Sequence, residues 1–184
     1  ASKIHVGNNY LAAFYKQYNQ NIEIIRTSIN VKDYKRRVAL KALPVIVWIG
    51  SPSTSKYLKL VVDALNELSL STNFLVRLIG FSDSLLESSF KFKYEIIAWS
   101  EAAELSELAN CDIGIMPIPN DPFERGKCGY KLIQYLASGL LPVASNVGIN
   151  REIIHGAQNG ILVNDNDWLK ALDSAIQNIS SHDS

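Results

Sequence analysis

From Pro44 onward, short apolar runs alternate with segments whose apolar residues recur every three or four positions. A run such as Val45–Ile49, apolar at every position, is typical of a strand that is covered on both faces. Strands that alternate with helices imply right-handed crossovers between parallel neighbours. The alternation therefore predicts an α/β, Rossmann-like fold with a doubly wound parallel sheet. The expected strands are 45–49, 74–79, 94–98, 113–118, 141–144 and 161–163.

Helices are expected between these strands. We predict one that opens at the turn containing Gly50 and ends near Ser71, because its apolar residues between Leu58 and Leu68 share one helical face. Further helices are expected over 101–109, 130–138 and 167–179, with a helical turn over 150–155.

The first 37 residues differ from the rest. Short strands are expected at 3–6 and 22–25, with a helix at 9–18 between them and a polar connector at 26–37. A βα unit and a linker ahead of the main sheet indicate that the chain opens with the tail of a preceding domain. We therefore predict two parts, residues 1–37 as that tail and its linker, and residues 38–184 as one Rossmann-like domain.

Charge and cysteine content narrow the function. Lysine plus arginine equals aspartate plus glutamate, 18 of each, so the net charge of zero gives no support for nucleic-acid binding. The two cysteines, Cys111 and Cys128, lack a CxxC spacing and suggest a reducing compartment without disulfides. No apolar run approaches the ~20 residues that a membrane span needs, and the first residues have no signal-peptide form. These features predict a cytoplasmic location.

The clearest sign of chemistry lies after the fourth strand of the main sheet. A loop at residues 121–129, which we call the anion loop, leads into a helix that begins near Tyr130. The free N–H groups of a first helical turn, and the helix dipole, favour a negative charge there. Lys127 and Lys131 add mobile positive charges that suit phosphate. Either lysine alone is typical of a solvated surface, but together in one place they predict a diphosphate site.

Two other positions at the same edge of the sheet have plainer interpretations. The turn at Gly50 lacks the G-x-G-x-x-G spacing of a dinucleotide fingerprint and also the G-x-x-x-x-G-K of a Walker A loop. Alone, it is typical of an ordinary strand-to-helix turn. Trp99 ends a strand, where core packing is the simpler explanation and a place beside a nucleotide base is the functional one.

No metal site is expected. The run Asp165-Asn166-Asp167 spells D-x-D, but these residues stand where a helix begins and aspartate is a good cap. The three histidines show no ligand spacing, and no other carboxylate lies near the D-x-D run to complete an oxygen site.

A family resemblance adds to this interpretation. Residues 112–152 read DIGIMPIPNDPFERGKCGYKLIQYLASGLLPVASNVGINRE. This run resembles the nucleotide-sugar-binding C-terminal domain of retaining, GT-B-fold glycosyltransferases (glycosyltransferase group 1), above all of bacterial members that build surface polysaccharides. Supporting similarity lies at residues 48–58, WIGSPSTSKYL, and in VGNNYLAAFY and IEIIRTSIN near the start. The resemblance spans nearly the whole chain.

The resemblance implies where a donor would lie. Gly50 and Ser51 would lie near the phosphates, and residues around Ala98 and Trp99 would border the base.

The diphosphate itself would be held in the anion loop. The resemblance implies that Cys128, Gly129 and Tyr130 offer backbone N–H groups to it, assisted by the side chains of Lys127 and Lys131.

One motif of the family differs here. Members often carry Glu-x7-Glu, whose second glutamate binds ribose and whose first touches the donor sugar, but this chain has Gly126 and Gln134 at those positions. Gln134 can still hydrogen-bond ribose hydroxyls through its amide. Gly126 cannot replace a carboxylate, and Glu124 is our candidate for that role. We accordingly assign catalytic roles to Glu124 and Lys131.

By resemblance, we predict the donor-binding domain of a metal-independent, retaining glycosyltransferase of the hexosyltransferase type. It would move a sugar from a nucleoside diphosphate sugar to a glycan or lipid-linked acceptor, with no further cofactor. The acceptor would bind mainly to the preceding domain, so the fragment alone should be inactive. A peripheral place at the inner membrane face is compatible with such a parent protein.

Two alternatives stay open. A non-catalytic nucleotide- or anion-binding module, such as a degenerate transferase, is favoured by Gly126 and Gln134. A nicotinamide-dependent oxidoreductase shares the fold and is disfavoured by the missing glycine fingerprint.

Overall fold

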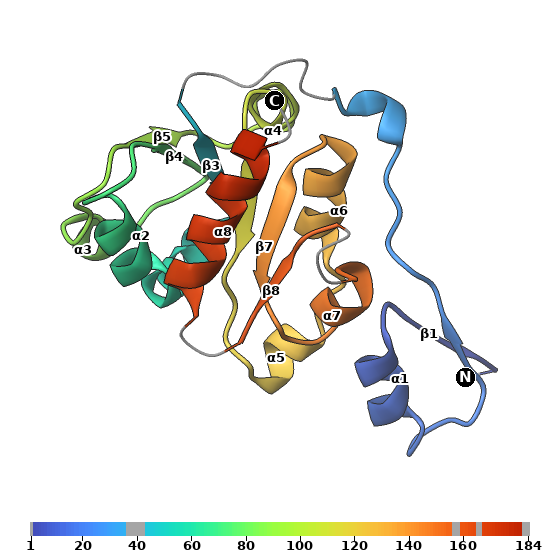
Figure 1. Ribbon diagram of the computed structural model, residues 1–184. Coiled ribbons are helices and arrows are strands. Elements are labelled where there is room, and N and C mark those ends of the chain that lie inside the picture. Colours follow the sequence, from blue (N-terminus) through green and yellow to red (C-terminus); the bar gives the residue numbers. More distant parts are fainter. Residues whose placement is uncertain (1, 36–42, 156–158, 165–166, 182–184) are drawn as a thin grey trace.

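The computed structural model describes residues 2–35, 43–155, 159–164 and 167–181 (Figure 1). Residues 2–35, which we call the N-terminal unit, lie beside the main sheet, next to α5 and α7 (Figure 1). The described residues from 43 onward form what we call the main domain. The predicted boundary at residues 37–38 lies outside the described residues, so the division into two domains remains a proposal.

The N-terminal unit is a small βαβ element. Strands β1 (Ile4–Val6) and β2 (Ile22–Ile24) pair in parallel, and α1 (Asn9–Tyr15) connects them. Asn8 caps α1, because its Oδ1 accepts from the N–H of Leu11 at 2.9 Å. A short 3₁₀ helix, η1 (Val31–Asp33), interrupts the expected connector. Both expected strands and the helix are present, although α1 ends earlier than its aromatic spacing suggests.

The main domain contains a six-stranded parallel sheet in the order β5-β4-β3-β6-β7-β8. Its strands are β3 (Val45–Ile49), β4 (Leu75–Ile79), β5 (Tyr94–Ile97), β6 (Ile113–Met116), β7 (Leu141–Ser145) and β8 (Ile161–Val163). The chain moves outward from β3 to β5, then returns to the other side of β3 and continues from β6 to β8. The predicted doubly wound parallel sheet is confirmed.

Helices cover both faces of this sheet (Figure 1). The residues of β3 alternate between two apolar clusters, with Ile46 and Trp48 in one and Val45, Val47 and Ile49 in the other. The first cluster is completed by α2 (Val62–Leu68) and α8 (Trp168–Ser181), and the second by α4 (Glu101–Leu108), α6 (Tyr130–Ala137) and α7 (Asn150–Ile153). Burial on both faces explains why β3 and β6, at the centre of the sheet, are apolar throughout.

The prediction of a single helix after Gly50 is wrong in part. The segment forms a 3₁₀ helix, η2 (Pro52–Leu60), and a separate α2. Its buried residues Ser55, Leu58 and Val61 recur every third position, which matches the three residues per turn of a 3₁₀ helix. Two short helices were not predicted, namely α3 (Ser84–Glu87) and α5 (Pro122–Arg125).

The sheet order changes direction between β3 and β6, which places the topological switch point there. These two strands pair only through Ile46 with Ile113 and Val47 with Gly114. Farther along, the hydroxyl of the fully buried Tyr135 bridges them. It accepts from the N–H of Ile49 at 3.3 Å and donates to the carbonyl of Ile115 at 3.2 Å. Burial raises the pKa of Tyr135, which keeps this donor protonated.

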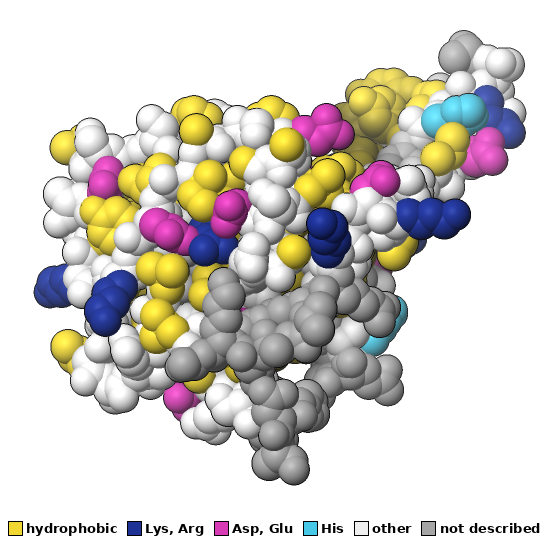
Figure 2. All heavy atoms as spheres, turned by 90° about the horizontal axis from the view of Figure 1, so that it is seen from above, with side chains coloured by type: hydrophobic (Ala, Val, Ile, Leu, Met, Phe, Trp, Pro, Cys, Tyr) yellow, Lys and Arg dark blue, Asp and Glu magenta, His cyan; other side chains and the backbone are white. Residues whose placement is uncertain are grey.

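The surface seen from above carries acidic and basic side chains side by side, and the N-terminal unit projects to one side (Figure 2). Among the described residues, the helices are all too short or too polar to cross a membrane.

Candidate functional site

The anion loop follows β6 at the switch point and contains α5. Asp121 caps α5, since its Oδ1 accepts from the N–H groups of Phe123 at 3.1 Å and Glu124 at 3.3 Å. The sequence does contain a signal for this helix. Asp121 is a good N-cap residue, and Pro122 after it is favoured at the first position of a helix. The short helix folds the loop back so that Lys127 comes close to Glu124.

Gly129 ends the anion loop and precedes α6. Its backbone is left-handed, with φ 70° and ψ 21°, a conformation that glycine adopts without strain. A Cβ atom at this position would lie 2.3 Å from Cδ1 of Ile153. Gly129 therefore lets the chain turn sharply into α6 while the loop stays packed against α7.

The backbone N–H groups just before α6 are the ones that the sequence predicts to bind an anion. In the part of the chain that the structure describes, the N–H groups of Cys128 and Gly129 donate to no other protein group. They stand just ahead of α6, where the helix dipole favours negative charge. The arrangement leaves two backbone donors for an anion at the carboxyl edge of the sheet.

Both predicted lysines lie at this edge, in the interior of the site. The Lys131 ammonium lies 5.4 Å from the centre of the Trp48 ring, against which Gly50 also packs. Burial lowers the pKa of Lys131 to about 8, and repulsion from the nearby Lys127 adds to the shift. Lys127 and Lys131 are therefore close enough for each to raise the cost of charging the other.

Lys127 has an acidic partner. Its Nζ lies 3.8 Å from Oε1 of Glu124 and 4.8 Å from the centre of the Tyr57 ring. Burial lowers the pKa of Lys127, although Glu124 and Asp121 oppose the shift. Lys131 thus lies near Lys127 and, across the Trp48 ring, near Gly50.

Glu124 is buried, with 2% of its side chain exposed, and it accepts a hydrogen bond from the Tyr57 hydroxyl. Burial and this bond raise the pKa of Tyr57 to about 12. In this structure Glu124 orders Tyr57 and Lys127, and its assignment as a catalytic residue remains a prediction. Tyr57 was missed because it lies in η2, far from the anion loop in sequence.

Ser51 begins η2 and is exposed. Its N–H donates to Oγ1 of Thr54 at 3.0 Å, and its hydroxyl lies 3.0 Å from that of Ser53. Three hydroxyl side chains therefore stand at the carboxyl end of β3, the strand beside the anion loop.

A second group of side chains lies around Glu104 of α4. The indole Nε1 of Trp99 donates to Oε2 of Glu104 at 2.7 Å, and the amide of Gln134 donates to its Oε1. The Trp99 ring remains 57% exposed. Glu104 thus joins Trp99 to Gln134. Trp99 was predicted as a site residue from its place at a strand end and Gln134 from the family motif, whereas Glu104 was not predicted.

Gln134 also reaches the N-terminal unit. It is 1% exposed, and its Nε2 donates to the hydroxyl of Tyr34 at 3.0 Å. A hydrogen bond with Tyr34 raises the pKa of Tyr130, whose side chain is half-exposed at the start of α6. Sequence reasoning missed Tyr34 because the connector that carries it reads as a polar linker.

The side chain of Cys128 lies close to Gly7 of the N-terminal unit. It lines a cavity of about 320 Å³ together with Arg26 and Thr27 of the N-terminal unit and residues of α6 and α7. The backbone role of Cys128 in anion binding remains a prediction.

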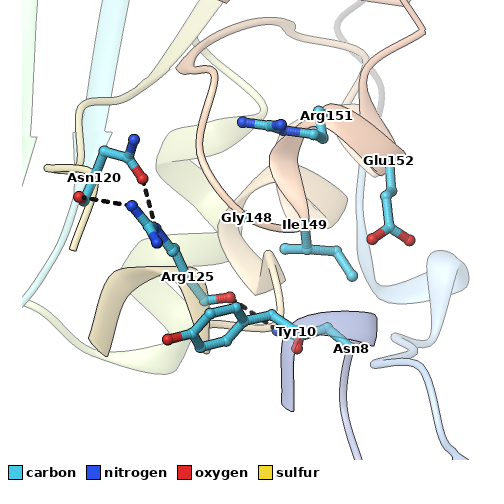
Figure 3. A pocket seen from close by; sticks show the side chains of 8 residues that line it. All are labelled: Asn8, Tyr10, Asn120, Arg125, Gly148, Ile149, Arg151 and Glu152. Carbon is cyan, nitrogen blue, oxygen red and sulfur yellow. Dashed lines mark hydrogen bonds between the residues drawn. The ribbon is translucent and has the colours of Figure 1, made fainter. Parts of the chain in front are cut away.

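A larger cavity, of about 390 Å³, lies between α1, α5 and α7 (Figure 3). The guanidinium of Arg125 points toward Asn120, whose Oδ1 it contacts at 2.8 Å (Figure 3). The lining residues are Asn8, Tyr10, Asn120, Arg125, Gly148, Ile149, Arg151 and Glu152.

Residues that could bind a metal do not cluster in the described ranges, where no group of three or more His, Cys, Asp or Glu side chains occurs. Asp165 and Asn166 of the D-x-D run lie outside those ranges, as does His182.

Comparison with known proteins gives a family match for most of the chain. Residues 43–182 match the family described as glycosyl transferases group 1. No curated protein sequence is a significant match.

Solved structures share the fold at low sequence identity. HepE of Anabaena in complex with UDP-glucose aligns with 100% of this chain at a TM-score of 0.79 and 15% identity. Sucrose-phosphate synthase of Thermosynechococcus elongatus aligns with 98% at a TM-score of 0.75 and 20% identity. WaaG, a glycosyltransferase involved in lipopolysaccharide biosynthesis, aligns with 94% at a TM-score of 0.77 and 13% identity. The chain spans about half of each, namely 55%, 49% and 53% of their lengths.

Proposed function

The chain belongs to the glycosyl transferases group 1 family, and from this premise we propose that it is the donor-binding part of a glycosyltransferase. Its substrate is a nucleoside diphosphate sugar, and the acceptor is a glycan or a lipid-linked glycan. The N-terminal unit is proposed to be the end of the preceding, acceptor-binding domain. The structures that the chain resembles include one in complex with UDP-glucose, which supports this donor class.

The observation that carries the proposal is a gathering of positive groups at the switch point. Among the described residues, the N–H groups of Cys128 and Gly129 donate to no protein acceptor, and two partly buried ammonium groups lie with them at the turn into α6. When the sugar leaves its diphosphate, negative charge develops on the departing oxygen. Donors fixed in a partly dry site stabilise such charge without rearranging. We propose that Cys128, Gly129, Lys127 and Lys131 do so here.

The remaining predicted residues divide between the two ends of the donor. We propose that Gly50 and Ser51 border the phosphates, since both stand at the end of β3 beside Lys131. We propose that Trp99 borders the base and that Gln134, joined to it by Glu104, lies near the ribose. Tyr130 contributes the next amide of the first turn of α6.

A non-catalytic nucleotide-binding module is the second candidate. The specific observation for it is that Glu124, the carboxylate assigned in place of the missing first motif glutamate, is buried and already paired with Tyr57.

Calorimetric titration of the chain with UDP-, GDP- and ADP-sugars tests donor binding. We expect one of the three to bind with a micromolar Kd and the other two more weakly. Absence of binding by all three contradicts both candidates. Transfer or hydrolysis of the bound donor by the longer parent protein distinguishes the transferase from the non-catalytic module.

Binding should also depend on pH through Lys131. In the empty site its pKa is about 8, so the ammonium form prevails below pH 8 and the neutral amine above it. A bound diphosphate favours the ammonium form, so binding above pH 8 requires uptake of a proton. We expect UDP affinity to be constant from pH 6.5 to 7.5 and to fall by up to about tenfold per pH unit between pH 8.5 and 9.5.

The matched control for this pH series is Lys131→Met, which cannot titrate. Its affinity should be lower and should lose most of the dependence above pH 8. An affinity of the unchanged chain that stays constant to pH 9.5 would contradict a role for the Lys131 ammonium.

A further inference from the structure

Asn8 of the N-terminal unit is in direct contact with the anion loop. Only 1% of its surface is exposed. Its Nδ2 donates to the carbonyl of Lys127 at 2.9 Å and to the carbonyl of Arg125 at 3.2 Å, while its Oδ1 caps α1. The buried amide of Asn8 therefore caps α1 in the N-terminal unit and also donates to two carbonyls of the anion loop in the main domain.

We infer that Asn8 is a positioning residue that holds the anion loop in its diphosphate-binding conformation. This inference rests on the proposed function. Asn8 lies on the far side of the loop from the anion, and it acts through the loop backbone.

The physical link is the rigidity of the peptide unit. In a trans peptide, the carbonyl of one residue and the N–H of the next point in opposite directions and turn together. Asn8 holds the carbonyl of Lys127, and the same peptide unit contains the N–H of Cys128. Fixing that carbonyl toward the N-terminal unit therefore directs the Cys128 N–H away from it.

The hydrogen bond to Arg125 adds a second fixed point two residues earlier. Between these points, the N–H of Lys127 donates to the carbonyl of Glu124 at 3.1 Å. The loop is thus held from both sides, and the peptide that ends at Cys128 has little freedom to rotate. Ordering the amide before the ligand arrives lowers the entropy cost of binding.

The N-terminal unit has a second anchor on the main domain. Glu152 of α7 accepts from Arg26 at 2.6 Å and from Asn9 at 3.0 Å and 3.1 Å. Asn8, Glu152 and the cavity between them appear together in Figure 3. These contacts hold the N-terminal unit on α7, whereas the two hydrogen bonds of Asn8 hold the anion loop itself.

Asn8→Asp separates the two roles of this side chain. Aspartate keeps the acceptor that caps α1, and it caps helices about as well as asparagine. It replaces the Nδ2 donor with an oxygen that faces the two loop carbonyls. We expect the Kd for UDP, measured by calorimetry on the whole chain, to rise about tenfold or more, as for the loss of two neutral hydrogen bonds.

A spectroscopic measurement separates positioning from a general loss of structure. In ¹H–¹⁵N spectra of the empty protein, the Asn8→Asp substitution should shift or broaden the amide signals of Cys128 and Gly129 and leave the signal of Leu136, at the far end of α6, in place. The matched control is Asn9→Ala, which removes a neighbouring contact to Glu152 and none to the loop. Its UDP affinity should stay within about twofold of the unchanged chain.

The outcomes are distinct. An unchanged chain that binds UDP, with an Asn8→Asp variant that binds equally well, overturns the inference and leaves the proposed function standing. The same holds if Asn9→Ala weakens binding as much as Asn8→Asp does, because the effect would then belong to the interface as a whole. If the unchanged chain binds none of UDP, GDP and ADP, the proposed function fails, and the inference with it. Should Asn8→Asp not fold, Asn8→Ser, which also caps a helix but lacks the Nδ2 donor, provides the same comparison.

Discussion

Replacing Lys131 by methionine is expected to weaken UDP binding about 30-fold and to make the empty protein more stable. The loss of affinity follows from removing one charged hydrogen bond, which contributes about 2 kcal/mol. The gain in stability has the opposite sign because burial disfavours the ammonium in the empty site, as its lowered pKa indicates. At pH 7 the gain should be on the order of 1–2 kcal/mol. Methionine fills a similar volume and keeps a favourable contact with the Trp48 ring.

Calorimetry gives the affinity, and urea denaturation gives the free energy of unfolding. Lys59→Met is the control, since Lys59 is exposed on η2 and should change neither quantity measurably. A Lys131→Met variant that binds UDP as well as the unchanged chain would show that this ammonium does not contact the diphosphate. A variant that binds poorly and is also less stable would show that Lys131 serves packing.

Replacing Gly114 by alanine should lower the free energy of unfolding by about 3 kcal/mol, the upper range for overpacking a core. A Cβ at this position would lie 2.3 Å to 2.7 Å from three atoms of the Tyr135 ring. That ring is fully buried, and its hydroxyl bridges β3 and β6, so it has no room to move away. The substitution therefore strains the switch point itself.

A double-mutant cycle with Tyr135→Leu identifies the cause. Removing the ring removes the clash, so Gly114→Ala should cost at least 1 kcal/mol less in the Tyr135→Leu background, as expected for residues in contact. Equal costs in both backgrounds, measured by urea denaturation, would mean that the ring is not what requires glycine at this position.

The fold was largely predictable from sequence because a strand that is buried on both faces appears in the sequence as an unbroken apolar run. The two strands at the centre of the sheet, β3 and β6, are apolar throughout, and the order of strands and helices then determines the topology. The segment after Gly50 was harder. Residues such as Leu58 and Val61, three apart, fit one face of an α-helix as well as a 3₁₀ helix, so spacing alone does not separate the two.

The site was predictable where its parts lie close together in sequence. Lys127, Gly129 and Lys131 are close in sequence around the start of α6, and the charges of the two lysines also interact in the structure. Tyr57 and Glu104 reach the same region from other elements and contact Glu124 and Gln134 there. No local pattern marks such side chains, because only the order of strands in the sheet brings their elements together. The same holds for Asn8. In the sequence it is recognisable only as a helix cap, and nothing nearby indicates its contact with the anion loop.

We propose that backbone amides and two ammonium groups at the turn into α6 bind one diphosphate. A crystal structure of the chain with UDP-glucose tests this most directly. We expect diphosphate oxygens within hydrogen-bonding distance of the N–H groups of Cys128 and Gly129, with the ammonium groups of Lys127 and Lys131 directed at them. A diphosphate bound elsewhere, or at this turn with both lysines directed into solvent, would contradict it.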